Sequence, residues 1–170
     1  MAAPFDDALE TPLGAVPIDR VAIEMVRTLP QFLVTDAPHE QESSVEVHVP
    51  FAQTVARDAS VVPLVVGDDS EREAAAVLDR LWRDETLVVV SSDMSRYYDA
   101  ARALRVDEAT SSSIERLDAD NIGDEQVCGA AALRATLRVA RQRGMRAARL
   151  ALRHCGSADE VVGFGAFAVG

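Results

Sequence analysis

The stretch Leu87-Val88-Val89-Val90-Ser91-Ser92-Asp93 decides how the rest of this sequence is interpreted. Four consecutive apolar residues are typical of a strand buried on both faces of a parallel sheet. Short polar side chains follow at once, and ligands of open α/β sheets bind just beyond the carboxyl ends of strands. The pattern therefore predicts a buried strand at 87–90 and a functional turn at Ser91, Ser92 and Asp93. The same turn residues can instead cap the following helix or stabilise the turn.

Strands and helices are predicted to alternate on both sides of this turn. The apolar run 61–66, ended by Gly67, predicts a second buried strand, and Ser70 is a good N-cap for a helix that continues to Trp82. The other predicted elements are helices at 19–29, 99–117 and 129–143, and strands at 149–152 and 161–169. This order is typical of a layered α/β domain with a mainly parallel sheet, and we expect one domain over residues 1–170.

Segment 44–56 is ambiguous. Val45, Val47 and Val49 alternate as in a strand, whereas the flanking residues also allow a helix, and Pro50 argues against an unbroken element of either kind.

Composition and charge exclude several classes of protein. The chain is 48% hydrophobic and 26% charged, and it contains no apolar run long enough to cross a bilayer. Its start carries Asp6, Asp7 and Glu10 and no basic segment, which is unlike a signal peptide. A net charge of −11 argues against nucleic-acid binding. We therefore expect a cytoplasmic protein with neither nucleic-acid nor membrane partners.

Cys128 is a candidate for chemistry because it precedes Gly129 and an Ala-rich predicted helix. A helix N-terminus favours the thiolate, which suits a nucleophile or a soft metal ligand, but a small side chain buried against the sheet fits equally well. His48 lies between valines, where a histidine in the core or at its rim is the simpler interpretation. The glycines of Gly163-Phe164-Gly165 fall inside a predicted strand and indicate close packing rather than phosphate binding.

Several short motifs occur in an order that resembles the Memo family, whose bacterial members are called AmmeMemoRadiSam system protein B. They are Thr11-Pro12-Leu13-Gly14, the stretch 42–51, Val62-Pro63-Leu64-Val65-Val66-Gly67, the stretch 89–97, Val127-Cys128-Gly129, Ser157 and Val162-Gly163-Phe164-Gly165-Ala166. The resemblance implies a fold like that of class III extradiol dioxygenases. It also implies a pocket for iron or copper, held by two histidines near the N-terminus and by the cysteine that Cys128 matches.

The chain departs from the family pattern at the pocket. Ser43 and Arg96 stand where the family has histidines, and the family's Pro-His-Ala-Gly segment is not found, so we expect an N-terminally truncated chain that corresponds to the C-terminal two-thirds of the family fold. Arg96 can neither ligate a metal nor act as a base near neutral pH. The candidates by role are as follows: catalytic Asp93, His48 and Glu46; pocket-lining Glu42, Ser43, Ser91, Ser92 and Arg96; and metal-ligating Cys128.

These features favour a Memo-like binding or assembly module without metal-dependent catalysis, and with no cofactor in this chain alone. We expect association with itself or with a protein partner through an exposed sheet edge. The alternative is a non-haem iron or copper oxidoreductase that is completed by the missing segment or by a partner subunit. Arg96 either binds an anionic ligand or pairs with Glu42 or Asp93.

Overall fold

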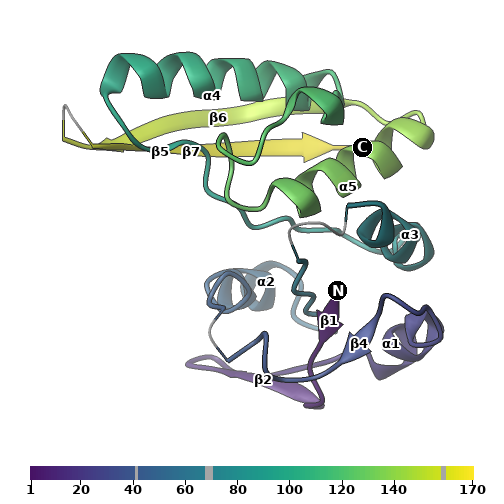
Figure 1. The fold of residues 1–170 in the computed structure, drawn as a ribbon. Coiled ribbons are helices and arrows are strands. Elements are labelled where there is room, and N and C mark those ends of the chain that lie inside the picture. The colour runs from purple at the N-terminus through teal and green to yellow at the C-terminus, as the bar shows by residue number, and fades with distance from the viewer. Residues whose placement is uncertain (41, 68–70, 158–159) are drawn as a thin grey trace. The chain divides into compact units, whose positions relative to one another are not determined.

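A computed structural model describes residues 1–40, 42–67, 71–157 and 160–170, and its elements are mixed α and β (Figure 1). The chain divides into two compact units, Met1–Gly67 with Asp79–Leu87, and Asp68–Leu78 with Val88–Gly170. The mixed α/β class is confirmed, and the expectation of a single domain stays a prediction.

In the first unit, helix α1 (Arg20–Val26) confirms the helix expected at 19–29, with a shorter extent. The Asp19 side chain accepts a hydrogen bond from the Ala22 N–H at 2.9 Å, which caps the start of the helix. Ile23 and Val26 are fully buried. The amphipathic spacing read from the sequence therefore marks the face of α1 that packs into the core.

Short strands that the sequence did not predict precede and follow α1 in the chain. Strands β1 (Ala2–Ala3) and β4 (Leu33–Val34) pair in parallel, and β2 (Ala8–Thr11) and β3 (Gly14–Pro17) form an antiparallel hairpin. Gly14 has φ of +112°, so the tight turn between β2 and β3 requires a residue without a Cβ.

The ambiguous segment 44–56 resolves into turns followed by helix α2 (Val49–Val55). Pro50 lies in the first turn of α2, where a missing N–H leaves no intrahelical hydrogen bond unmade. The proline therefore sets where the helix starts instead of breaking an element.

The buried strand expected at 61–66 is reduced to isolated bridges, which Val61 makes with Ile18 and Val65 with Ala2. The Val65 and Ala2 backbones exchange two hydrogen bonds of 2.9 Å. Pro63 between them has no N–H to donate, so a continuous ladder cannot run through it.

The prediction of a buried strand at 87–90 is wrong. No helix or strand includes these residues, and Leu87 and Val89 are 85% and 61% exposed. An apolar run is buried on both faces only where neighbouring strands and layers cover it. No strand among the described residues pairs with segment 87–90. The prediction that these residues lie in the core failed because it rested on hydrophobicity alone.

In the second unit, β5 (Arg96–Tyr98), β7 (Val161–Val169) and β6 (Ala147–Gly156) form a sheet in that order. Both pairings are antiparallel. The two strands expected near the C-terminus are confirmed, but the mainly parallel sheet is not. Among the described residues only β1 and β4, with two residues each, form a parallel ladder.

Helices α4 (Ala100–Glu115) and α5 (Ala130–Gln142) confirm those expected at 99–117 and 129–143. The Asp99 side chain caps α4 by accepting from the Arg102 N–H at 2.9 Å. Gly144, just after α5, has φ of +70°, as expected for a residue that ends a helix. A short 3-10 turn, η1 (Ala119–Asn121), lies between the two helices in the chain.

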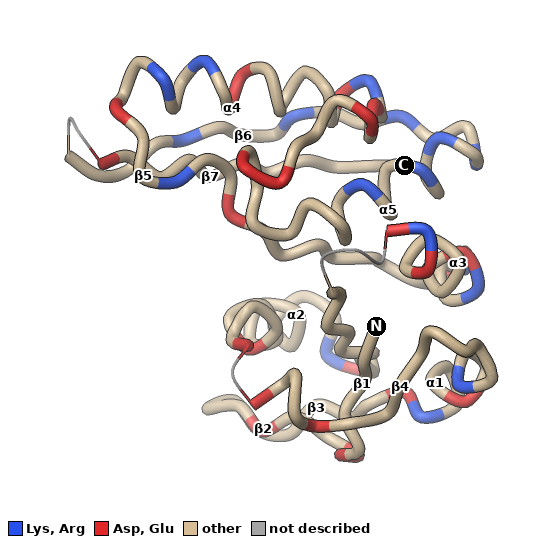
Figure 2. Tube along the Cα trace, viewed as in Figure 1, with Lys and Arg blue, Asp and Glu red and all other residues tan. Residues whose placement is uncertain are grey.

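Helix α3 (Glu71–Leu81) agrees with the helix expected up to Trp82, whereas its expected cap, Ser70, lies outside the described residues. Acidic and basic residues alternate along α3, and basic residues lie on α5 (Figure 2). Glu71 accepts hydrogen bonds from both Arg134 and Arg138 on α5, and the Arg134 bond measures 3.0 Å. One carboxylate thereby ties the start of α3 to two turns of α5, a charge-assisted arrangement stronger than a single neutral hydrogen bond.

The core of the second unit contains a charged residue, Asp107 of α4, which is completely buried. Its Oδ1 accepts from the Ser95 N–H at 2.9 Å, and its Oδ2 lies 2.8 Å from His154 Nε2 on β6. A Cβ added to Gly163 of β7 would lie only 2.0 Å from the same Oδ2. The glycines expected to permit close packing therefore do so, since Gly163 makes room for a buried carboxylate.

We predict that Gly163→Ala lowers the free energy of unfolding by about 1–3 kcal/mol, because the new methyl group displaces Asp107 from its partners. Urea denaturation followed by circular dichroism measures the loss. Gly170→Ala, where a Cβ meets nothing within 4 Å, is the control. In an Asp107→Ala background the same Gly163 substitution should cost less, and equal costs in both backgrounds would contradict the steric explanation.

Candidate functional site

The predicted turn Ser91-Ser92-Asp93 lies beside the start of α5, and backbone hydrogen bonds fix it from two directions. The Cys128 N–H donates to the Asp93 carbonyl at 3.1 Å, and the Met94 N–H donates to the Gly163 carbonyl of β7 at 3.2 Å. Buried Asp107 holds the next N–H of the chain, that of Ser95. The turn is therefore positioned by α4, by β7 and by the residue that leads into α5.

The Cys128 thiol faces this turn. The Asp93 N–H donates to Sγ at 3.1 Å, and Ser92 Oγ lies 3.6 Å from the same sulfur. Cys128 lies directly before Gly129, the N-cap of α5, as the sequence predicted. It is free and exposed, so the alternative of a small side chain buried against the sheet is wrong.

Ser92 also holds the start of α5. Its Oγ accepts from the Gly129 N–H at 2.9 Å. A Cβ on Gly129 would approach Ser92 Cβ to 3.1 Å and the Ser91 carbonyl to 3.2 Å. The glycine therefore allows the chain before α5 to lie directly against the turn, and Ser92 combines the two roles that the sequence left open, those of site residue and cap.

Arg96 forms an ion pair with Asp93, three residues earlier, in which one guanidinium nitrogen donates to Oδ2. Both side chains are about two-fifths exposed, at 42% and 38%. Burial lowers the pKa of Arg96, but the hydrogen bond and charge of Asp93, with smaller effects from Cys128 and Tyr97, raise it overall above its ordinary value. Of the two roles considered for Arg96, the structure shows the ion pair with Asp93.

Tyr97, the residue after Arg96, has a left-handed backbone with φ of 60° and a side chain that is 73% exposed. A bulky residue in this region is strained by roughly 1–2 kcal/mol, and strained residues of this kind cluster at functional sites. The register of β5 against β7 shifts between Arg96 and Tyr98, so the strain accompanies a bulge at the edge of the turn.

The other candidates lie in the first unit, in the turns before α2. The Ser44 N–H donates to Glu42 Oε1 at 2.9 Å, and mainly for this reason the pKa of the Glu42 carboxyl is lowered. His48 Nδ1 lies 2.8 Å from the Ser44 carbonyl, and His48 is exposed, unlike the core or rim histidine expected. Ser43 and Glu46 are exposed as well.

The candidates thus form two groups. Ser91, Ser92, Asp93, Arg96 and Cys128 come together in the second unit. Glu42, Ser43, Glu46 and His48 belong to the first unit. The catalytic roles proposed for Asp93, His48 and Glu46 stay predictions.

Comparison with known families gives a match to the model described as Memo-like protein, over residues 1–167. The chain belongs to the Memo family. This match covers both units and includes every motif on which the resemblance was based.

Curated Memo relatives are similar at a moderate level of identity. A "MEMO1 family protein" of Aquifex aeolicus is 37% identical over 122 residues, which are 68% of this chain and 45% of the relative. That of Thermotoga maritima is 35% identical over 115 residues, 64% of this chain and 42% of the relative. "MEMO1 family protein Ta0237" of Thermoplasma acidophilum is 33% identical over 171 residues, 91% of this chain and 63% of the relative. The chain therefore spans about two-fifths to two-thirds of the length of these relatives.

The turn Ser91-Ser92-Asp93, Arg96 and Cys128 do not by themselves fit the iron or copper ion that the family implies. Cys128 supplies one thiol, and the Asp93 carboxylate is engaged by Arg96, which cannot ligate a metal. A protein metal site of this kind needs at least three protein ligands. In the described parts of the chain, no three His, Cys, Asp or Glu side chains are grouped so that they could hold a metal ion.

The sequence analysis did not identify Asp107 and His154. Asp107 holds the backbone next to the turn through Ser95, and His154 contacts Asp107. Both interact over long sequence separations, 12 residues to Ser95 and 47 between each other, so no local spacing marks them. The one available signal was the pair of glycines in β7, which indicated a close approach without naming the partner.

We predict that Ser92→Ala lowers the free energy of unfolding by about 1 kcal/mol, because the Gly129 N–H at the start of α5 loses its acceptor. Ser91→Ala is the matched control, since no hydrogen bond of the Ser91 side chain is seen among the described residues. It should stay within about 0.5 kcal/mol of the wild type. Equal losses in chemical denaturation of the two variants would show that Ser92 has no special role.

Proposed function

We propose that this Memo family chain acts as a binding or assembly module and does not carry out metal-dependent oxidation on its own. The observation that carries the proposal is the ion pair between Arg96 and Asp93 beside Cys128. The resemblance implies a family histidine at the position of Arg96, and the Arg96 guanidinium pairs with the carboxylate of Asp93, whose backbone N–H donates to the thiol. The turn is thereby suited to polar contacts with a partner and poorly suited to ligating a cation.

Segment 88–90 provides the surface for assembly. Val89 is 61% exposed, and no described residue hydrogen-bonds to the backbone of Val88, Val89 or Val90. Consecutive valines favour an extended backbone, and an apolar extended segment with free N–H and C=O groups pairs readily with a strand from elsewhere. We propose that a second copy of the chain or another protein supplies this strand.

Pairing with strands from another chain would also account for the mainly parallel sheet that the family implies. Segments 61–66 and 87–90 have the composition of buried parallel strands, and strands added beside them would extend a mainly parallel, dioxygenase-like sheet. We propose this fold for the assembled protein, with the cytoplasm as its location. No described helix is long and apolar enough to span a membrane.

A second candidate function is a Memo-type oxidoreductase, favoured by the preserved setting of Cys128. Its sulfur accepts from the Asp93 N–H, as a thiolate ligand would. Iron or copper would then require further ligands from a segment beyond the matched residues or from a partner subunit, and the metal would supply the redox chemistry.

We predict that the purified chain self-associates in a concentration-dependent manner and that Val89→Asp abolishes this association, because a charge on the pairing segment opposes its burial. Size-exclusion chromatography with light scattering measures the mass. Val21→Asp is the matched control, since Val21 is 76% exposed but lies on helix α1, whose backbone is already hydrogen-bonded. A monomeric wild type, or equal loss of association in both variants, would contradict self-association through segment 88–90.

We further predict that the purified chain binds well below one equivalent of iron or copper, and that Arg96→His raises binding, because an imidazole can ligate where a guanidinium cannot. Plasma mass spectrometry after metal loading and desalting measures the content. Stoichiometric metal in the wild type that is lost in Cys128→Ala but kept in Cys155→Ala would instead establish the oxidoreductase.

A further inference from the structure

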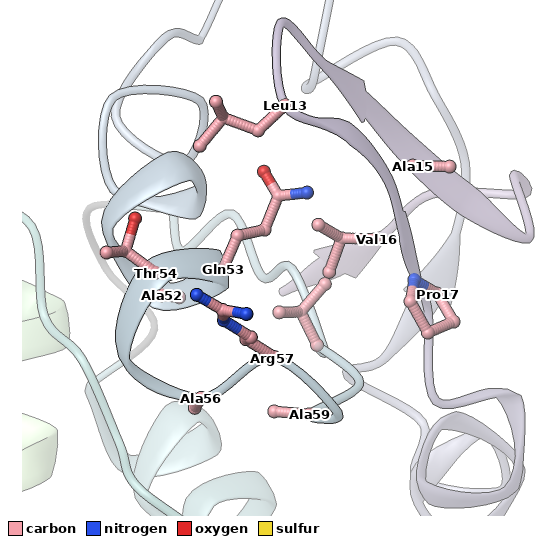
Figure 3. Close-up of a pocket in the computed structure, with 11 residues that line it drawn as sticks. Leu13, Ala15, Val16, Pro17, Ala52, Gln53, Thr54, Ala56, Arg57 and Ala59 are labelled. Carbon is pink, nitrogen blue, oxygen red and sulfur yellow. The ribbon is translucent and has the colours of Figure 1, made fainter.

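The first unit contains a pocket of about 420 Å³ between hairpin β2–β3 and helix α2, in which none of the candidate residues discussed so far takes part (Figure 3). Leu13, Val16 and Pro17 line it from the hairpin side, and α2 with the turn after it lines the other. Its volume falls in the range of sites that bind small organic molecules.

Small side chains leave this space open. Four of the lining residues are alanines, two from helix α2 and its end, one from the hairpin and one from the following turn: Ala15, Ala52, Ala56 and Ala59. Larger apolar residues at these positions would close the gap between hairpin and helix. The small size of these side chains therefore contributes to the volume of the pocket.

Hydrogen bonds across the pocket hold its two walls together. Gln53 of α2 donates from Nε2 to the Gly14 carbonyl at 3.1 Å, and its Oε1 lies 2.5 Å from Thr11 Oγ1. The Leu13 N–H donates to the same threonine oxygen at 3.1 Å. Thr11 and Gly14 belong to the motif Thr11-Pro12-Leu13-Gly14, to which the proposed function assigns no role. Leu13 of this motif lines the pocket, and Thr11 and Gly14 hold Gln53 of the opposite wall.

Arg57 supplies the charge at the pocket. It lies just beyond α2, it is exposed, and no carboxylate of the described residues pairs with its guanidinium. The other polar lining groups already have partners within the protein: Gln53 as above, and Thr54, whose hydroxyl donates to the Pro50 carbonyl at 2.9 Å. Arg57 is thus the lining group whose donors remain available to a ligand.

We propose that this pocket binds a small organic monocarboxylate with an apolar body. The guanidinium of Arg57 would pair with the carboxylate, and the hairpin wall with its facing alanines would cover the hydrocarbon. One cation beside an otherwise apolar or internally satisfied lining matches a ligand with one anionic group. A polyanion would have no second cation in the lining to meet it.

The test is a titration of the isotope-labelled chain with octanoate, followed by NMR of the backbone amides. Octanoate should shift resonances of lining residues such as Val16 and Ala59. Octan-1-ol, which has the same chain without charge, should bind about tenfold more weakly, because a charge-assisted hydrogen bond is lost. Inorganic phosphate alone should not shift these resonances.

Two variants separate the contributions of charge and shape. Arg57→Gln should weaken octanoate binding about tenfold or more, whereas Arg72→Gln, a matched removal of charge from an exposed position on α3, should leave it unchanged. Ala56→Trp should fill the pocket and abolish binding of both octanoate and octanol, and its circular dichroism shows whether the fold is intact. No shifts at millimolar octanoate, or equal affinity for the Arg57 variant and the wild type, would overturn the proposal.

Discussion

The site of this protein depends on one buried carboxylate. Asp107 is inaccessible to water, its oxygens contact the Ser95 N–H and His154, and Gly163 leaves the space that its Oδ2 occupies. A buried carboxyl group without such partners would be strongly destabilising, so these contacts are needed to keep Asp107 in the core. Because Ser95 follows the functional turn directly, the same contacts that stabilise the core also set the position of Asp93 and Arg96.

At the turn itself, the backbone contacts and the side-chain chemistry come from different groups. Cys128 and Asp93 remain joined by hydrogen bonds in both directions, from the Cys128 N–H to the Asp93 carbonyl and from the Asp93 N–H to the sulfur. The Asp93 side chain instead forms an ion pair with Arg96. The position of the turn and its chemistry therefore depend on different residues.

The two units pose different questions about binding. In the second unit, segment 88–90 with its exposed Val89 lies next to the turn in sequence, so strand pairing and any contact made by Arg96 would involve neighbouring residues. In the first unit, the pocket beside Arg57 is built from the hairpin and α2 alone. The two proposals therefore rest on separate residues, and one can fail without the other.

The sequence by itself determined the helices other than α2 and the two C-terminal strands, because caps, glycines and hydrophobic periodicity are local signals. Asp19, Asp99 and Gly144 mark helix ends where they were expected. Sequence motifs also indicated the family and predicted a functional turn at Ser91-Ser92-Asp93. Only the tertiary structure decided that Leu87 and Val89 are exposed, that the largest sheet among the described residues is antiparallel and that Arg96 pairs with Asp93. The reason is physical: burial, strand pairing and ion pairing depend on which neighbours cover a residue, and a run of valines looks the same in sequence whether or not another strand lies beside it.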